Sequence, residues 1–123
     1  MDNKIKEDKA IELIKQYEMK RRNLKTDNTI KRMSKNSGYD LDSGNRKIEV
    51  KATSQSEFNK GLRLNSQDEI EKIDDIYIYR VINVLSDKPQ LFIVKGSEGI
   101  IGKTQLSAGY SVPKDKQGEP IDL

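Results

Sequence analysis

The order of apolar patterns along this chain predicts one α/β (α+β) domain, in which helices flank a mixed β-sheet. Three observations carry this prediction. Apolar residues recur at helical spacing near the N-terminus, charged and apolar residues alternate around a Gly-Asn turn in residues 38–51, and a long apolar run spans residues 76–85. In chain order we expect a helix, three strands, a second helix, a strand and one added strand.

The first helix follows from an apolar stripe. Residues at positions i, i+3, i+4 and i+7 predict an amphipathic helix from about Ile5 to Arg22. The stripe consists of Ala10, Leu13, Ile14 and Tyr17. Between this helix and the Gly-Asn turn we expect a loop or a short helix that Ile30 and Met33 anchor.

The later elements have shorter signals. Leu62 and Leu64 alternate with Arg63 and predict a third strand, and Ser66-Gln67-Asp68-Glu69 is a capping box that would open a short helix. The strand in residues 76–85 is apolar in both alternation classes, so we expect it to be central and covered on both faces. Residues 90–94 return as a further strand. The domain would thus span residues 1–95, with residues 96–123 as an extension that packs on the surface or is mobile.

The turn at Gly44-Asn45 sets a register for the strands around it. In a two-residue hairpin turn of this composition, residues whose numbers sum to a constant lie opposite one another. Tyr39 then faces Val50, and Leu41 faces Ile48, on one side of the sheet. A slip of one residue would place apolar residues opposite charged ones, so turn and pattern agree. The opposite side carries the charged residues Asp40, Asp42, Lys47, Glu49 and Lys51.

Two acids meet across this hairpin. Asp40 lies opposite Glu49 in the predicted register, with Cβ atoms roughly 5 Å apart, and carboxylates this close repel one another unless a cation lies beside them. A divalent metal ion is one explanation. The other is that charged and apolar residues alternate in any half-exposed hairpin, so the pair alone leaves both interpretations open.

The composition excludes several kinds of chemistry. The 123 residues include no cysteine and no histidine, which rules out disulfides, thiolate nucleophiles and Ser-His-Asp triads. Catalysis would depend on carboxylates, lysine, tyrosine, hydroxyl groups or a hard metal ion. No stretch is apolar enough to span a membrane, and the N-terminus lacks the apolar run of a signal peptide. We therefore expect a soluble, cytoplasmic protein without membrane contact.

Positive charge is concentrated in one window. The formal net charge is +3, but residues 20–35 carry seven basic side chains against one acid, Asp27. Such a window fits a polyanionic partner such as a nucleic acid. The alternative is that its first residues stabilise the C-terminus of a helix, where positive charge is favourable. The predicted nucleic-acid-binding residues are Lys20, Arg21, Arg22, Lys25, Lys31, Arg32 and Lys35.

The hairpin residues and the order of elements resemble those of a nuclease superfamily. A helix, a hairpin with Asp40 and Glu49-Val50-Lys51, a strand, a helix and a strand follow the core order of PD-(D/E)xK nucleases. These proteins have a restriction-endonuclease-like fold and include Holliday-junction resolvases. More narrowly, roughly residues 8–94 resemble the domain at the C-terminus of NO VEIN proteins. That resemblance lies in Tyr17-Glu18, Gly38-Tyr39-Asp40-Leu41-Asp42-Ser43, Ile48-Glu49-Val50-Lys51 and Leu64-Asn65-Ser66.

The resemblance implies roles for individual residues. Asp40 matches the first metal-binding acid of the superfamily, Glu49 the second, and Lys51 the catalytic lysine. Glu18 matches an acid that many members carry on the first helix near the metal. The proline that often precedes the first acid is replaced here by Tyr39. The cofactor implied is Mg²⁺ (or Mn²⁺), the partner is DNA, and the chain can pair as a homodimer, as resolvase-like members do.

These residues suit phosphodiester hydrolysis. A Mg²⁺ ion held by Asp40, Glu49 and the backbone carbonyl of Val50 would activate a water molecule and stabilise the charge that develops on the phosphate. Lys51 follows Glu49 by two residues and so shares its face. It would orient the water and neutralise a phosphate oxygen.

Two further acids are candidates for a supporting role. Asp42 is the rival of Asp40 for the metal, but it lies opposite Lys47, with which it can form a simple ion pair. Glu18 follows Ile14 by four residues and stands at the margin of the buried stripe. A solvated glutamate is as reasonable there as one that supports the metal.

The sequence thus predicts a Mg²⁺-dependent endonuclease, a hydrolase acting on DNA. One alternative is a catalytically silent nucleic-acid-binding or regulatory module with the same fold. Another is a protein-interaction domain that uses an exposed edge strand and the segment from Gly96. The salt dependence of DNA binding would distinguish this last alternative from the other two, because affinity for DNA falls steeply with added salt when several phosphates are neutralised.

Overall fold

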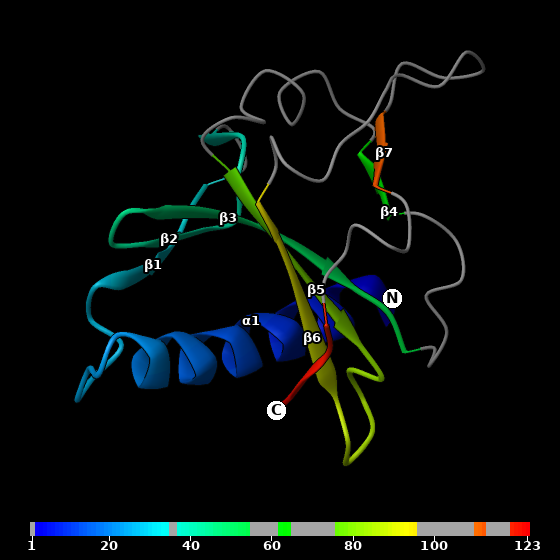
Figure 1. The fold of residues 1–123 in the computed structure, drawn as a ribbon, viewed down its shortest axis with the longest axis horizontal. Helices are drawn as coiled ribbons and strands as arrows, with labels where there is room; N and C mark the ends of the chain where they lie inside the picture. The colour runs from blue at the N-terminus through cyan, green and yellow to red at the C-terminus, as the bar shows by residue number, and fades with distance from the viewer. Residues whose placement is uncertain (1, 35–36, 55–61, 65–75, 96–109, 113–118) are drawn as a thin grey trace.

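A helix and a mixed sheet make up the core of the protein. The computed structural model describes residues 2–34, 37–54, 62–64, 76–95, 110–112 and 119–123. The helix α1 (Asp2–Arg21) lies across one face of a six-stranded sheet (Figure 1). The mixed α+β class is therefore confirmed, whereas the restriction-endonuclease-like order remains a prediction.

The six strands follow one another in the order β1-β2-β3-β5-β6-β8. β3 and β5 are parallel, and the other neighbouring pairs are antiparallel. A second sheet pairs β4 (Leu62–Leu64) with β7 (Tyr110–Val112). The strands of the main sheet are β1 (Ile30–Arg32), β2 (Leu41–Ser43), β3 (Arg46–Ala52), β5 (Ile76–Ile82), β6 (Gln90–Lys95) and β8 (Ile121–Asp122).

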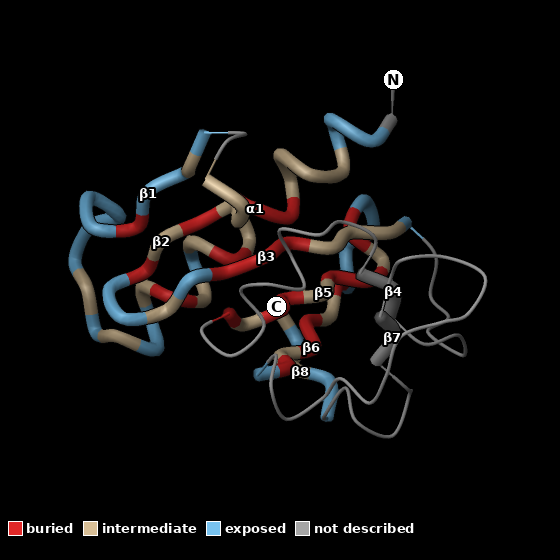
Figure 2. Tube along the Cα trace, turned by 90° about the horizontal axis from the view of Figure 1, so that it is seen from above, coloured by how far each residue is buried: buried red, intermediate tan, exposed pale blue. Residues whose placement is uncertain are grey.

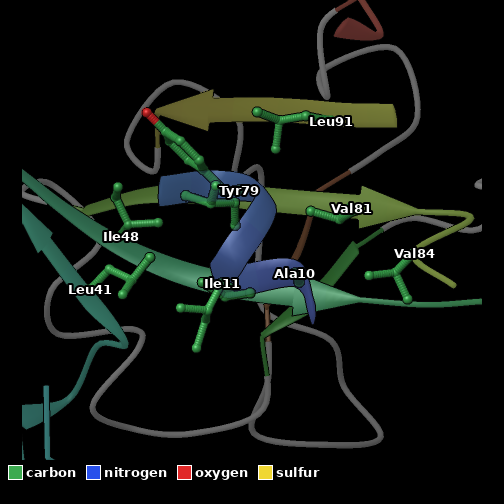
Figure 3. Packing of buried hydrophobic residues seen from close by; sticks show 10 residues of the cluster. Ala10, Ile11, Leu41, Ile48, Tyr79, Val81, Val84 and Leu91 are labelled. Carbon is green, nitrogen blue, oxygen red and sulfur yellow. The ribbon is translucent and has the colours of Figure 1, made fainter. Parts of the chain in front are cut away.

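The apolar stripe of α1 packs against the sheet as its spacing predicts. Ala10 and Ile14 are fully buried, and Leu13 and Tyr17 are partly buried. Ile11 joins them, because the apolar stripe of a globular helix is broader than one row of residues. Figure 3 shows this face of the helix against side chains of the strands, among them Leu41, Ile48, Tyr79 and Val81. No helix in the described ranges is long and apolar enough to cross a membrane.

The C-terminus of α1 has a defined cap that turns the chain toward β1. Asn23 has a positive φ of 55°, which asparagine tolerates better than most residues. Its N–H donates to the Lys20 carbonyl at 3.2 Å, and the Leu24 N–H donates to the Met19 carbonyl at 2.8 Å. These two bonds form a Schellman motif. Lys20 and Arg21 lie in the last turn, where positive charge interacts favourably with the helix dipole.

The hairpin register follows the prediction from Ser43 to Leu41. The Cα partners are Ser43 with Arg46, Asp42 with Lys47 and Leu41 with Ile48. Gly44 has a φ of +65°, while Asn45 does not have a positive φ, which matches the type II′ turn with glycine at its first central position. The turn therefore fixes which residues of β2 and β3 share a face.

Before Leu41 the register changes, so the prediction that Asp40 lies directly opposite Glu49 is wrong. The Asp40 N–H donates to the Ile48 carbonyl at 2.9 Å, although Ile48 is already the partner of Leu41. Two residues of one strand thus face one residue of the other, which is a β-bulge. The extra residue reverses the alternation of side chains between the two faces of the sheet. Tyr39 therefore lies on the face of Asp42, to which its hydroxyl donates, instead of facing Val50.

Other elements differ from the prediction or lie outside the described residues. Residues 30–32 form β1 instead of a loop or short helix, because they pair with β2 at the edge of the sheet and bury Ile30. The strand at residues 62–64 is confirmed, but it pairs with β7 outside the main sheet. The helix predicted from Ser66 and the side chain of Lys35 fall on residues that are not described.

The strand predicted to be central is β5, which lies between β3 and β6. Both of its faces are buried, with Ile76, Ile78, Tyr79 and Val81 at most 1% exposed. Figure 2 shows burial concentrated along β3, β5 and β6 and exposure in the connection between α1 and β1. Near the C-terminus, β8 adds an edge strand to the main sheet, and the division into residues 1–95 and 96–123 stays a prediction.

Candidate functional site

Asp40 lies where β2 separates from β3, and three hydrogen bonds hold it there. Its N–H donates to the Ile48 carbonyl at 2.9 Å, and its carbonyl accepts from the Met33 N–H at 2.8 Å. Its carboxylate oxygen Oδ2 accepts from the Val50 N–H at 2.7 Å. The side chain thus replaces the backbone acceptor that β2 no longer offers to Val50 beyond the bulge.

This position brings the Asp40 carboxylate to the side of β3 on which the backbone carbonyl of Val50 lies. The Val50 N–H belongs to the peptide unit that joins Glu49 to Val50. In a strand the N–H and C=O groups of one residue point to the same side, so the Val50 carbonyl faces the same opening. Oδ1 of Asp40, the oxygen not engaged by Val50, remains as a further donor. We call the space between the Asp40 carboxylate and the Val50 backbone the β2–β3 opening.

Glu49 and Lys51 lie on the sheet face that is opposite to α1. In β3 they alternate with Ile48 and Val50, which pack in the core with α1. Glu49 is 8% exposed, and its Oε2 lies 3.5 Å from Nζ of Lys51. The two residues therefore form a partly buried ion pair on the face that the alternation predicts for them.

Arg80 is a basic residue of this face that sequence reasoning missed. It is the Cα partner of Lys51 in the parallel pairing of β3 and β5. Burial lowers the pKa of its guanidinium below the ordinary value. No local pattern pointed to Arg80, because the pairing of β3 with β5 joins segments that are distant in the chain.

Asp42 has a different partner from the predicted one. Lys47 is its Cα partner, but within the described residues its carboxylate accepts a hydrogen bond from the Tyr39 hydroxyl at 3.2 Å and forms no ion pair with Lys47. Nζ of Lys47 lies 5.9 Å from the centre of the Tyr39 ring. Burial, and then the hydrogen bond to Asp42, raise the pKa of Tyr39 above its ordinary value. The bulge explains this change, because it brings Tyr39 to the charged face.

Glu18 is fully buried on the opposite face, where α1 packs, in a network of hydrogen bonds. Nε and Nη2 of Arg21 both donate to its carboxylate, the former at 2.8 Å. The Ser43 hydroxyl donates to Oε1 at 2.8 Å, and the Tyr79 hydroxyl donates to Oε2 at 2.7 Å. Ser43 alternates with Asp42 in β2, so this network lies across the sheet from Glu49 and Lys51.

The network keeps Glu18 ionised in spite of its burial. Burial raises the pKa of its carboxyl, but the hydrogen bonds that it accepts outweigh this effect and hold the pKa below the ordinary value of 4.5. Burial, and then the bond to Glu18, raise the pKa of the Tyr79 hydroxyl well above its ordinary value of 10.0. Glu18 thus joins α1 to the hairpin and to β5. The sequence hint was Arg21, which follows Glu18 by three residues on the helix.

All three arginines of the predicted basic window are engaged within the protein. Arg21 binds Glu18, and Nη1 of Arg22 donates to the Ser43 hydroxyl at 3.1 Å. Arg32 donates to Asp8 at 2.9 Å and lies 3.9 Å from Glu7. The lysines Lys20, Lys25 and Lys31 are exposed and form no ion pair with another described residue. The described residues of the window therefore lie on three segments, α1, the following turn and β1.

The donor set at the β2–β3 opening fits a hard divalent cation. It would draw on the Asp40 carboxylate, which accepts from the Val50 N–H, on the Val50 carbonyl and on the carboxylate of Glu49, the residue before Val50. Oxygen atoms are the ligands that Mg²⁺ prefers. A group of three or more acidic side chains that could hold a metal ion does not occur in the described part of the chain. A Mg²⁺ ion would thus bind through few protein ligands and retain several waters, as is usual for this ion.

Comparison with known proteins identifies the family of the chain. The family described as "Protein NO VEIN, C-terminal" matches residues 6–94. The chain belongs to this NO VEIN C-terminal family. The match includes most of α1, the hairpin, β5 and most of β6, and therefore every residue of the β2–β3 opening. Neither a curated protein nor a solved structure matches the chain.

Proposed function

We propose that this member of the NO VEIN C-terminal family is a metal-dependent nuclease that hydrolyses phosphodiester bonds of DNA at the β2–β3 opening. The observation that carries the proposal is the contact of the Asp40 carboxylate with the peptide unit between Glu49 and Val50. The Asp40 carboxylate thus contacts the segment of β3 that also carries the Val50 carbonyl and the Glu49-Lys51 ion pair. The resemblance to PD-(D/E)xK nucleases supports the same residues.

Each residue has a distinct role in this proposal. Asp40 and Glu49, with the Val50 carbonyl, would hold Mg²⁺ or Mn²⁺. The ion would supply a bound water of lowered pKa and a positive charge near the phosphate. The Lys51 ammonium, fixed 3.5 Å from Glu49, would bind a phosphate oxygen and compensate the charge that develops on it. DNA would approach the face opposite to α1, where Arg80 adds a second positive charge next to Lys51.

Cleavage assays test the activity. Branched, duplex and single-stranded DNA would be incubated with Mg²⁺ or Mn²⁺ and with the wild type, Glu49→Gln or Lys51→Ala. We expect cleavage by the wild type and at least about a hundredfold loss in each variant. Asp87→Asn, an exposed change in the turn between β5 and β6, is the matched control and should cleave normally. Failure of the wild type to cut any of these substrates would contradict the proposal.

Asp40→Asn separates catalysis from structure. The amide oxygen of asparagine can still accept the Val50 N–H, so the bulge should persist, whereas one negative charge of the metal site is lost. We expect Asp40→Asn to keep its thermal stability and to lose both Mn²⁺ binding by calorimetry and cleavage. Asp40→Ala would lose stability as well, because the Val50 N–H would have no acceptor.

A catalytically silent nucleic-acid-binding or regulatory module is the second candidate. It is supported by the same hydrogen bond, because satisfying the Val50 N–H is by itself a sufficient structural role for Asp40. This candidate predicts that Asp40→Asn and Glu49→Gln bind DNA as the wild type does, with or without Mg²⁺. Cleavage by the wild type that these variants lose would exclude it.

A further inference from the structure

Three arginines converge on one buried carboxylate where α1 ends beside the β2-β3 turn. Arg21 contacts Glu18 directly. Arg22 reaches it through the Ser43 hydroxyl, which accepts from Nη1 of Arg22 at 3.1 Å and donates to Glu18. On the other side, Nη1 of Arg46 donates to the Tyr79 hydroxyl at 2.7 Å, and this hydroxyl donates to Glu18.

The charges of this cluster do not balance. Arg21 and Glu18 neutralise each other, whereas Arg22 and Arg46 are hydrogen-bonded to neutral hydroxyl groups. Neither guanidinium forms an ion pair with a carboxylate of the described ranges. The C-terminus of α1 contributes roughly half a negative charge. An excess of more than one positive charge therefore remains on two half-buried side chains.

Both guanidinium groups are held in place by packing. A Cβ atom at Gly44 would lie 2.9 Å from Nη2 of Arg22, so this guanidinium rests directly on the turn. The guanidinium carbon of Arg46 lies 4.2 Å from the centre of the Tyr77 ring, a contact that orients the group and is favourable in itself. Ser43 and Arg46 are cross-strand partners that flank the turn. The bonds to Ser43 and Tyr79 each use one of the five N–H donors of an arginine.

We propose that Arg22 and Arg46 form an anion site that binds a phosphate group of a nucleic-acid backbone. Each of these two oriented guanidiniums keeps spare N–H donors, and arginine binds phosphate oxygens bidentately. The site lies on the face of the sheet that α1 covers, across from Glu49 and Lys51. It would therefore anchor a phosphate other than the one that is cleaved. The inference goes beyond the proposed nuclease activity and does not require a metal ion.

The experiment measures binding to the full chain in the presence of EDTA, so that the metal site does not contribute. Inorganic phosphate is titrated first, and backbone amide resonances are followed by NMR. A short DNA duplex is titrated next, and its affinity is measured by fluorescence anisotropy at several salt concentrations. Arg22→Gln and Arg46→Gln remove one charge each but keep a donor for the hydroxyl group. Lys88→Gln, which removes one exposed charge from the turn between β5 and β6, is the matched control.

We expect inorganic phosphate to shift the amides of Ser43, Gly44 and Arg46 in the wild type. Each glutamine variant should weaken duplex binding about tenfold and reduce the slope of log affinity against log salt by about one, while Lys88→Gln should match the wild type. Arg46→Lys, which keeps the charge, should recover part of the affinity. Cleavage does not enter any of these measurements, so failure of the nuclease proposal would leave their outcome unchanged.

Three results would overturn the inference, the last of them in its choice of ligand. One is a phosphate titration of the wild type that leaves the amides of residues 43–46 unshifted. This titration needs no variant, so it tests the inference even if Arg46→Gln fails to fold. The second is an equal fall in duplex affinity in Lys88→Gln and in the arginine variants, which would show that the effect comes from net charge alone. Amide shifts with inorganic phosphate but no dependence of duplex binding on Arg22 or Arg46 would refute the nucleic-acid source and leave a site for small phosphates.

Discussion

Replacing Glu18 by glutamine should destabilise the fold strongly, although the two side chains have nearly the same shape. Glu18 is 0% exposed, and all of its partners in the network are donors. A glutamine amide would keep one acceptor oxygen, but it would direct its two N–H groups at donors. It would also leave the Arg21 guanidinium without its anion.

The magnitude follows from the burial of the pair. Removing one partner of a buried ion pair costs about 3–5 kcal/mol. The Arg21 side chain is 26% exposed and can regain some hydration. We therefore expect the free energy of unfolding to fall by about 3 kcal/mol, the lower end of this range. For a domain of this size, 1 kcal/mol corresponds to roughly 4 °C in Tm, and the melting temperature should fall by about 12 °C.

Urea denaturation followed by circular dichroism measures this loss, with the slope of the transition as a check that the folded state is unchanged. The control is Glu12→Gln on the same helix, because the Glu12 side chain is 59% exposed and lies 3.9 Å from Lys9. Exposed pairs contribute little, so Glu12→Gln should stay within about 0.5 kcal/mol of the wild type. The reasoning would be refuted if the two variants were equally stable.

The remaining predictions concern pH, the turn and the core. Because the pKa of Glu18 is lowered in the folded state, its stabilisation is present above its ordinary pKa of 4.5. It is lost as the pH falls through the lower folded-state pKa, so urea melts at decreasing pH should show a steeper loss for the wild type than for Glu18→Gln. The pKa of Tyr79 is raised, so its stabilisation is present below pH 10.0 and is lost as the pH rises through the higher folded-state pKa. Ultraviolet titration of the wild type should show one tyrosine that ionises later than the others, and Tyr79→Phe should lack it. Gly44→Ala should cost about 1–2 kcal/mol because φ is +65° there, whereas Asn45→Ala should cost less than half as much in the same melts. Ile14→Ala should cost about 3 kcal/mol as a core truncation, and the same change at the exposed Ile5 should have little effect; equal losses at the two positions would contradict the assigned core.

Sequence patterns correctly predicted the helix, the hairpin and the central strand, each of which depends on residues that are close together in the chain. The stripe in α1 depends on the period of one helix, and the β2-β3 register depends on a two-residue turn, so both were confirmed. The apolar run that became β5 was confirmed as central for the same reason, since both of its alternation classes are apolar. In each case the physical cause lies within about a dozen consecutive residues.

The predictions at the candidate site depend on how those elements meet. The β-bulge at Asp40 moved this residue out of its place opposite Glu49 and carried Tyr39 to the other face. Glu18 stood at the margin of a stripe, and only the packing of α1 against Ser43 and Tyr79 decided that it is buried. Arg46 carried no signal at all, because its partners lie on β5, roughly thirty residues away in the chain.

By itself the sequence determined the chemistry that is available to the protein and the order of its local elements. Without cysteine and histidine, the candidate chemistry is limited to carboxylates, lysine, hydroxyl groups and hard metal ions. The tertiary structure alone decided which charges face one another. It joined Glu18 to Arg21, Ser43 and Tyr79 on one side of the sheet and Glu49 to Lys51 on the other. The physical reason is that a charge becomes costly or useful only through its burial and its partners, and both arise when distant segments pack together.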